Sequence, residues 1–274
     1  MNFDAAYLKQ NNPRLDKVVV EAAQNAGYGL LPLWHYSRAN KPFSNFDMSE
    51  ALHIGHHLGS MLQALTLERS IKASGGGGHL LLLCVKSEKP LRVRDGGCSV
   101  IFSLDLDGGY RNPGWGDSIS EGLFIGGFSS EAREVQRIVA AARENGDCSN
   151  AAEILASKKI RAVLIGAGFD SLVYGNTVEM PCDKPRQFFK GVNVVGVPTQ
   201  RSLSDSVAIL KPEMAKCLDS IVLGADGLPI PLAQRFSPET DLRGMSLCPT
   251  LQGPCFASVL HEKAVVRPNQ PVLP

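Results

Sequence analysis

The chain has 274 residues, 44% of them hydrophobic and 20% charged, and its 28 basic and 27 acidic residues leave a formal charge of +1. This composition is typical of a globular protein that buries a sizeable core. Because the charges balance, we expect no long-range field that would attract nucleic acid or an anionic membrane. No apolar stretch approaches the roughly 20 residues that a membrane-spanning helix needs.

The cysteines and the N-terminus bear on location. The seven cysteines include no C-x-x-C pair, and their odd number favours reduced thiols over a disulfide framework. Residues 1–17 contain no apolar h-region of a secretory signal. We therefore expect a cytoplasmic protein, with transfer into a host cell by a specialised secretion system as an alternative.

The first predicted elements are a helix and a strand. Residues 14–26 place apolar side chains at helical spacing, and Gly27 is typical of a helix end. "LLPLWHYS" at 30–37 predicts a strand, and 36–52 predicts a loop.

The next segment begins with a capping pattern. Ser60 and Gln63 predict a capping box for a helix that runs to about Lys72. "GGGG" at 75–78 then breaks the chain. A buried strand, a turn marked by Pro90 and a second short strand follow.

The middle of the chain predicts two further helices. Residues 96–128 are rich in Gly and Asp and predict loops with short strands. Helices are predicted at 130–144 and at 150–158, the second with Asn150 as a possible cap. A strand is predicted at 171–175.

The last elements surround a loop at 181–202, in which Phe188 and Phe189 either dock a protein substrate or cover the sheet. "DSVAILKP" predicts a strand that ends at Pro212, with a short helix near 213–221. Because strands and helices do not alternate regularly, the sequence predicts an α+β fold with a mostly antiparallel or mixed sheet.

Three histidines fall within "HIGHHLGS" at 53–60, a cluster that suggests zinc. H-E-x-x-H is absent, and Gly55 and Gly59 disfavour the helix that would put His53 and His56 on one face. No cysteine or carboxylate lies nearby at ligand-like spacing. We therefore predict no metal site. The chain also lacks G-x-S-x-G, a P-loop and a full dinucleotide fingerprint.

Five segments follow one another in an informative order: "AGYGLLPLWHYSRANKPFSNFD", "HIGHHLGS", "PLRVRDGG", "GFDSLVYGNTVE" and "DSVAILKP". This succession resembles the ADP-ribosyltransferase superfamily. It is most similar to the bacterial and phage branch found in polyvalent proteins and in some secreted effectors. The resemblance spans about residues 15–215, with the segments in order and at compatible distances.

The resemblance implies a fold and an activity. It implies an NAD-binding split β-sandwich with flanking helices over residues 1–223, followed by a Pro-rich extension at 224–274. NAD would be the only cofactor. The implied reaction moves one ADP-ribose unit to a macromolecular acceptor. We expect a protein side chain, possibly of a host protein; a nucleic acid or a small molecule is the less favoured acceptor.

The resemblance also assigns roles to five residues. His35 would hydrogen-bond the NAD ribose, and Tyr36 and Ser37 would bind the nicotinamide amide. His57 would stack on the nicotinamide ring. Glu179 would be the catalytic carboxylate, stabilising the positive charge that develops on the ribose as nicotinamide leaves and polarising the incoming nucleophile.

Two departures from the family pattern leave alternatives open. Tyr36 replaces the usual glycine, which would add bulk to the nicotinamide pocket. Ser206 stands where the related polymerases have their glutamate, so either Glu179 or Asp205 would supply the carboxylate. The alternatives to transfer are an NAD glycohydrolase and a non-catalytic module that binds a nucleotide or a partner.

Overall fold

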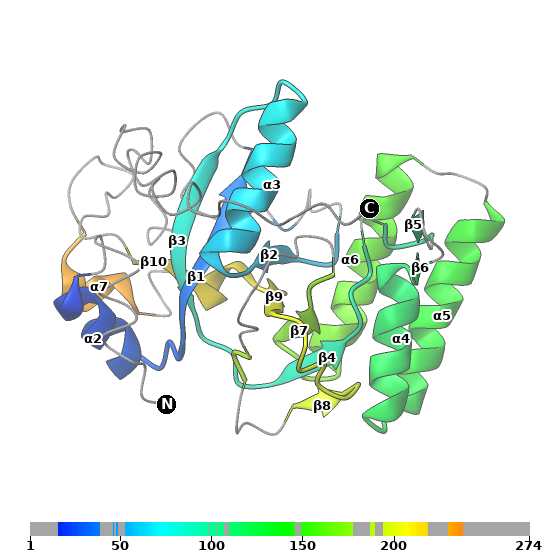
Figure 1. Cartoon of the computed structure of the whole chain (residues 1–274). Coiled ribbons are helices and arrows are strands. Elements are labelled where there is room, and N and C mark those ends of the chain that lie inside the picture. Colours follow the sequence, from blue (N-terminus) through cyan, green and yellow to red (C-terminus); the bar gives the residue numbers. More distant parts are fainter. Residues whose placement is uncertain are drawn as a thin grey trace, which may run out of the picture.

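The computed structural model describes residues 16–38, 46, 48, 53–97, 99–102, 104–106, 110–145, 149–177, 187–189, 194–218 and 230–237. Two sheets, a small hairpin and several helices make up this part of the chain (Figure 1). The fold is therefore α+β, as the sequence predicts.

The smaller sheet has three antiparallel strands in the order β1-β3-β10. These are β1 (Leu30–Ser37), β3 (His79–Val85) and β10 (Ala215–Cys217). Its outer face is covered by α2 (Lys17–Asn25), α3 (Met61–Ala73) and α7 (Leu232–Arg235). The buried side chains between them include Val19, Ala23, Trp34, Tyr36, Ile71 and Leu82.

The larger sheet has five strands in the order β2-β9-β7-β4-β8. They are β2 (His56–Leu58), β9 (Asp205–Ile209), β7 (Ser171–Gly175), β4 (Pro90–Val93) and β8 (Val195–Gly196). β2, β9 and β7 pair antiparallel, whereas β4 pairs parallel with β7 and β8. The sheet is therefore mixed, as predicted.

Three helices form one side of the molecule next to this sheet (Figure 1). They are α4 (Trp115–Ile125), α5 (Ser129–Glu144) and α6 (Asn150–Gly166). The hairpin of β5 (Leu104–Leu106) and β6 (Tyr110–Asn112) lies near them. The core between helices and sheet includes Leu91, Val93, Ile119, Leu123, Ile160 and Leu172.

The two sheets pack against each other through a third cluster. Leu33 and Leu81 from the three-stranded sheet meet Val173 and Val207 from the five-stranded sheet. Within the described part of the chain, one isolated antiparallel bridge also joins the sheets: Trp34 and Gly59 exchange two main-chain hydrogen bonds of 2.9 Å. The bridge therefore holds β1 beside the end of β2.

Helix ends in the first third follow the local sequence. The Ser60 hydroxyl accepts a hydrogen bond from the Gln63 N–H at 3.2 Å, and the Gln63 side chain accepts one from the Ser60 N–H at 2.7 Å. The predicted capping box is confirmed. Gly27 follows α2 with a φ of 88°, a left-handed conformation that glycine adopts at little cost.

The prediction of loops and short strands across 96–128 is wrong in part, because α4 lies within it. Gly116 and Gly122 lower the helix propensity of this stretch. They also let α4 approach its neighbours: a Cβ on Gly116 would lie 2.2 Å from Val139, and one on Gly122 would lie 2.9 Å from the Arg92 carbonyl oxygen. Close packing explains the helix better than local propensity.

α6 is longer than the predicted helix at 150–158. Ile160 and Leu164 are fully buried on the face that packs against the five-stranded sheet, so the apolar run "RAVLIG" continues the helix. The helix is capped by the hydroxyl of Ser149, and Asn150 is its first residue.

The prediction of a short helix at 213–221 is wrong. A single 3-10 turn at Pro212–Met214 is followed by β10. β10 pairs with the edge of β3 that β1 leaves open, and so satisfies main-chain donors and acceptors there.

Phe188 and Phe189 are 8% and 5% exposed and belong to the cluster between the sheets. Of the two interpretations, the one in which they cover the sheet is confirmed. Of the predicted extension 224–274, the structure describes 230–237, where Phe236 lies 5.8 Å from the ring of Tyr28. This part of the extension therefore packs on the core.

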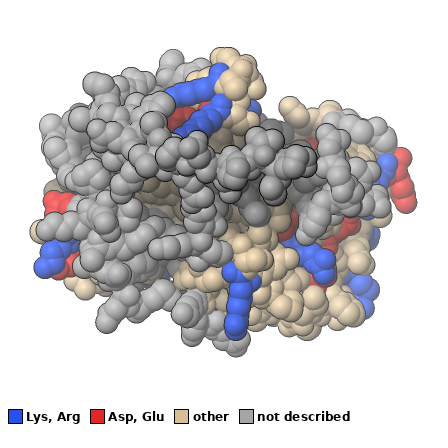
Figure 2. Space-filling model, in the orientation of Figure 1, with Lys and Arg blue, Asp and Glu red and all other residues tan. Residues whose placement is uncertain are grey.

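None of the helices in the described residues is both long and apolar enough to cross a membrane. On the face drawn in Figure 2, the basic and acidic side chains of the described residues are interspersed. Several pair with an opposite charge on the same helix, such as Lys72 with Glu68 on α3.

Candidate functional site

His35 lies near the end of β1, beside β2. Its Nδ1 is 2.7 Å from the main-chain carbonyl oxygen of His57. Because a carbonyl only accepts, Nδ1 carries the proton of this hydrogen bond, and Nε2 of the neutral ring is an acceptor. Burial lowers the pKa of His35 to about 4. His35 is therefore neutral at pH 7 and can accept a hydrogen bond from a ligand hydroxyl.

Aromatic rings surround His35. Phe46 meets it edge-on with ring centroids 5.0 Å apart, and His56 lies 5.9 Å away. Phe46 and His56 stack on each other at 4.3 Å. The side of β2 that faces His35 thus presents His56.

His57 points to the opposite face of β2. Its Nδ1 hydrogen-bonds the hydroxyl of Tyr174 at 2.8 Å, and its ring lies 4.9 Å from Trp115 and 5.6 Å from His53. Its Nε2 is buried and has no hydrogen-bond partner among the described residues, and burial holds the pKa of His57 well below the usual value. The structure brings the main chain of His57 to His35, but not its ring.

Tyr36 and Ser37 follow His35 on opposite faces of β1. The Tyr36 side chain is 4% exposed and packs in the cluster under α2 and α3. It therefore adds no bulk on the His35 side. Ser37 is 8% exposed and, by strand alternation, shares the face of His35. The start of β3 passes close to it, since a Cβ on Gly78 would lie 2.2 Å from the Ser37 carbonyl oxygen.

Glu179 lies outside the described residues. The segment before it is held at two points as it leaves β7. The Asn176 side chain donates to the Ser206 hydroxyl at 3.0 Å. The N–H and hydroxyl of Thr177 both donate to the carboxylate of Asp95, at 2.7 and 2.8 Å. Asp95, the acidic residue of "PLRVRDGG", therefore fixes the start of this segment.

Asp205, the alternative carboxylate, is fully buried in an ion pair. Its two oxygens accept from Arg92 at 2.7 and 3.0 Å, and one also accepts from the Phe188 N–H at 3.1 Å. Ser206 is 2% exposed and also donates to Gln63 at 3.3 Å. Both side chains are thus engaged in contacts within the protein.

The sequence analysis assigned no role to three residues that contact the predicted site residues: Trp115, Tyr174 and Arg92. Trp115 and Tyr174, which enclose His57, have no local signal because they come from distant elements. Arg92 does have a local signal. In the strand "PLRV" it alternates with the buried Leu91 and Val93, so its side chain faces the other side of the sheet.

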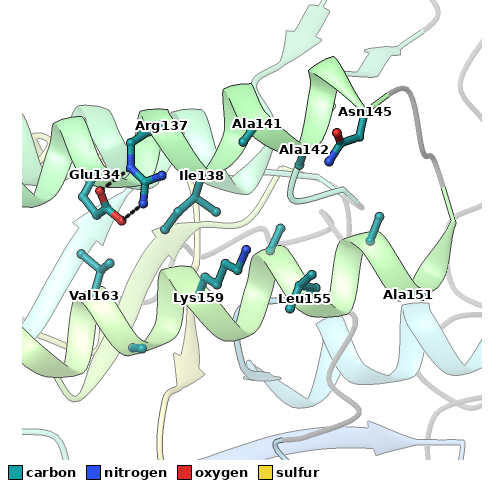
Figure 3. Close-up of a pocket in the computed structure, with 13 residues that line it drawn as sticks. Glu134, Arg137, Ile138, Ala141, Ala142, Asn145, Ala151, Leu155, Lys159 and Val163 are labelled. Carbon is teal, nitrogen blue, oxygen red and sulfur yellow. Dashed lines mark hydrogen bonds and ion pairs between the residues drawn. The ribbon is translucent and has the colours of Figure 1, made fainter.

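Groups of three or more histidine, cysteine, aspartate or glutamate side chains that could hold a metal ion are absent from the described residues. A hollow of about 710 Å³ lies on the surface between α5 and α6 (Figure 3). Alanines are six of its thirteen lining residues, and Glu134, Arg137 and Lys159 are among the polar ones. None of the predicted site residues lines it.

Comparison of the chain with protein-family models, with curated proteins and with solved structures gives no match.

Proposed function

We propose that the chain is an NAD-dependent mono-ADP-ribosyltransferase with a split β-sandwich of the kind this superfamily uses. One observation carries the proposal. The five segments of the resemblance contain strands β1, β2, β4, β7 and β9. Four of them are consecutive neighbours in the five-stranded sheet, in the order β2-β9-β7-β4, and β1 of the other sheet is bridged to Gly59, the residue after β2. Segments spread over most of the chain would not gather in this way by their order in the sequence alone.

The surroundings of His35 support its proposed role. A neutral imidazole with Nδ1 bound to the protein leaves Nε2 to accept a hydrogen bond from a ribose hydroxyl. In the proposed reaction, the bond between nicotinamide and the ribose breaks and the acceptor nucleophile bonds to the same ribose carbon. The nucleophile loses its proton, and nicotinamide leaves as a neutral molecule.

Glu179 is the proposed carboxylate for this step. The carboxylate of Asp205 is bound by Arg92, and Ser206 has a hydroxyl, which accepts from Asn176, and no carboxylate. Glu179 is two residues beyond Thr177, which Asp95 holds next to the five-stranded sheet. It would stabilise the cationic ribose and polarise the acceptor.

A second candidate is a non-catalytic module that binds a nucleotide or a partner. One observation favours it: the position of the polymerases' glutamate is a serine whose hydroxyl is buried in the protein's own hydrogen bonds. Such a module would need no carboxylate at this place.

Incubation with NAD labelled in the ADP-ribose part and a cell lysate tests the proposal. We expect label on discrete protein bands with the wild type and none with Glu179→Gln. Glu144→Gln, the same change at an exposed position on α5, should label normally. Free ADP-ribose without labelled protein would indicate a glycohydrolase. Binding of NAD with neither product would support the non-catalytic module, and equal labelling by Glu179→Gln would contradict the role of Glu179.

A further inference from the structure

Arg161 is a buried arginine on α6 whose guanidinium binds main-chain carbonyls. It is 7% exposed. One terminal nitrogen donates to the carbonyl oxygen of Ile54 at 3.1 Å, and the other donates to that of Met48. Within the described residues it forms no ion pair. Burial lowers the pKa of Arg161, so the charge is costly to hold here and these two carbonyls are what compensates for it.

Both carbonyls belong to residues that precede β2, the strand that contains His56 and His57. Ile54 is fully buried in the core between the helices and the five-stranded sheet. Gly55 then passes so close to β9 that a Cβ would lie 2.1 Å from the Ile209 carbonyl oxygen. The chain entering β2 is therefore held by α6 on one side and by the end of β9 on the other.

The histidines that follow depend on this placement. His56 stacks on Phe46 beside His35, and the carbonyl of His57 binds His35. A shift of the chain at Ile54 would move both contacts, because β2 has only three residues and begins two positions later.

We propose that Arg161 is a positioning residue: it sets the place of β2 so that the His57 carbonyl meets His35 and His56 faces the same side. This inference rests on the proposed function only for its effect on NAD. The geometric part concerns β2 itself. A guanidinium suits the task because its planar fork reaches two carbonyls at once, which a lysine ammonium on a single stem does less well.

The geometric part is tested without any activity. The His57 ring lies close to Trp115 and Tyr174, so ring currents displace its resonances from those of free histidine. In Arg161→Ala we expect the imidazole signals of His56 and His57 to move, and sub-denaturing guanidinium chloride to return them toward the wild type. Arg133→Ala, at an exposed arginine of α5, should leave them unchanged. Unchanged histidine signals in folded Arg161→Ala overturn the proposal.

The effect on NAD is measured by calorimetry with the same proteins. We expect Arg161→Ala to bind NAD about 10-fold more weakly, which corresponds to about 1.4 kcal/mol. Guanidinium should recover part of this loss, whereas a purely structural role would give no such recovery. If the wild type binds no NAD, the proposed function fails, while the histidine signals still decide the role of Arg161.

A variant that keeps the charge covers the case in which Arg161→Ala does not fold. Arg161→Lys can reach one carbonyl, so we expect histidine shifts and an NAD affinity between those of the wild type and a full loss. Wild-type signals and affinity in Arg161→Lys would overturn the proposal, because the fork would then be unnecessary.

Discussion

The imidazole of His35 has one nitrogen bound to the protein, and among the described residues no hydrogen bond engages the other. This division allows the two nitrogens to be tested separately. An asparagine side chain can replace Nδ1, and a glutamine side chain can replace Nε2.

We expect His35→Ala to weaken NAD binding by about 10-fold or more, as loss of one buried hydrogen bond and of the ring contact predicts. His35→Asn should bind NAD as weakly as His35→Ala, although it can keep the bond to the His57 carbonyl. His35→Gln should retain part of the affinity, because its amide oxygen can accept at the Nε2 position. Calorimetry measures all three, and wild-type affinity in His35→Ala would refute the assignment.

The sequence could identify His35 more readily than the partner on β2. Strand alternation requires that His56 and His57 face opposite sides. Which of them faces His35 depends on the pairing of β2 with β9, more than 140 residues away, and on the bridge between Trp34 and Gly59. No local pattern contains that information. The resemblance selects His57, whereas the structure puts the ring of His56 beside His35.

At the scale of elements, a helix start with its own capping pattern is easier to predict than a short strand. The capping box of α3 involves only residues 60–63, so it depends on no distant part of the chain. β10 has three residues and exists only because the edge of β3 pairs with it. Local sequence patterns therefore predict where α3 begins, but they predict a helix where β10 lies.

The ion pair between Arg92 on β4 and Asp205 on β9 spans the strand β7 that lies between them. Both side chains are buried, at 4% and 0% exposure. Removing one charge would leave the other buried without its partner. We expect Asp205→Asn to lower the free energy of unfolding by about 3–5 kcal/mol.

Asp117→Asn is the matched control for this prediction. Asp117 pairs with Arg143 at 2.7 Å, but both side chains are about 40% exposed. Loss of such a surface pair should cost at most about 1 kcal/mol. Urea unfolding of the two variants gives the comparison, and equal small losses would mean that the buried pair contributes little. A catalytic role for Asp205 would instead predict lost activity with unchanged stability.

At the scale of the whole molecule, the strands that share the resemblance are neighbours, but they come from both sheets. In the residues that the structure describes, the sheets meet at the bridge between Trp34 and Gly59 and across the apolar cluster that includes Leu33 and Val207. The sequence could predict the strands individually from their apolar runs. It could not predict how they are ordered in space, because that order depends on pairings between residues far apart in the chain.

His35, His53 and His57, which lie where the two sheets meet, should make the stability of the whole fold depend on pH. Burial lowers the pKa of His35 to about 4 and also lowers the pKa values of His53 and His57. In the unfolded chain these groups titrate near about 6.5. Below that pH the unfolded state binds more protons than the folded state, so acid favours unfolding.

We therefore expect full stability above about pH 6.5 and a progressive loss as the pH falls toward about 4, where His35 also protonates in the folded state. His35 and His57 each contribute a slope that approaches about 1.4 kcal/mol per pH unit within this window, and His53 adds to the slope in the same direction. Urea unfolding at a series of pH values measures the slope. In His57→Asn, the amide can take the place of Nδ1 and still bond the Tyr174 hydroxyl but cannot titrate, so the slope between pH 6.5 and pH 5 should fall by up to about 1.4 kcal/mol per pH unit. The same slope in both proteins would show that His57 has the same pKa in the folded and the unfolded state. The surroundings of His57 would then be more open to water than its contacts indicate.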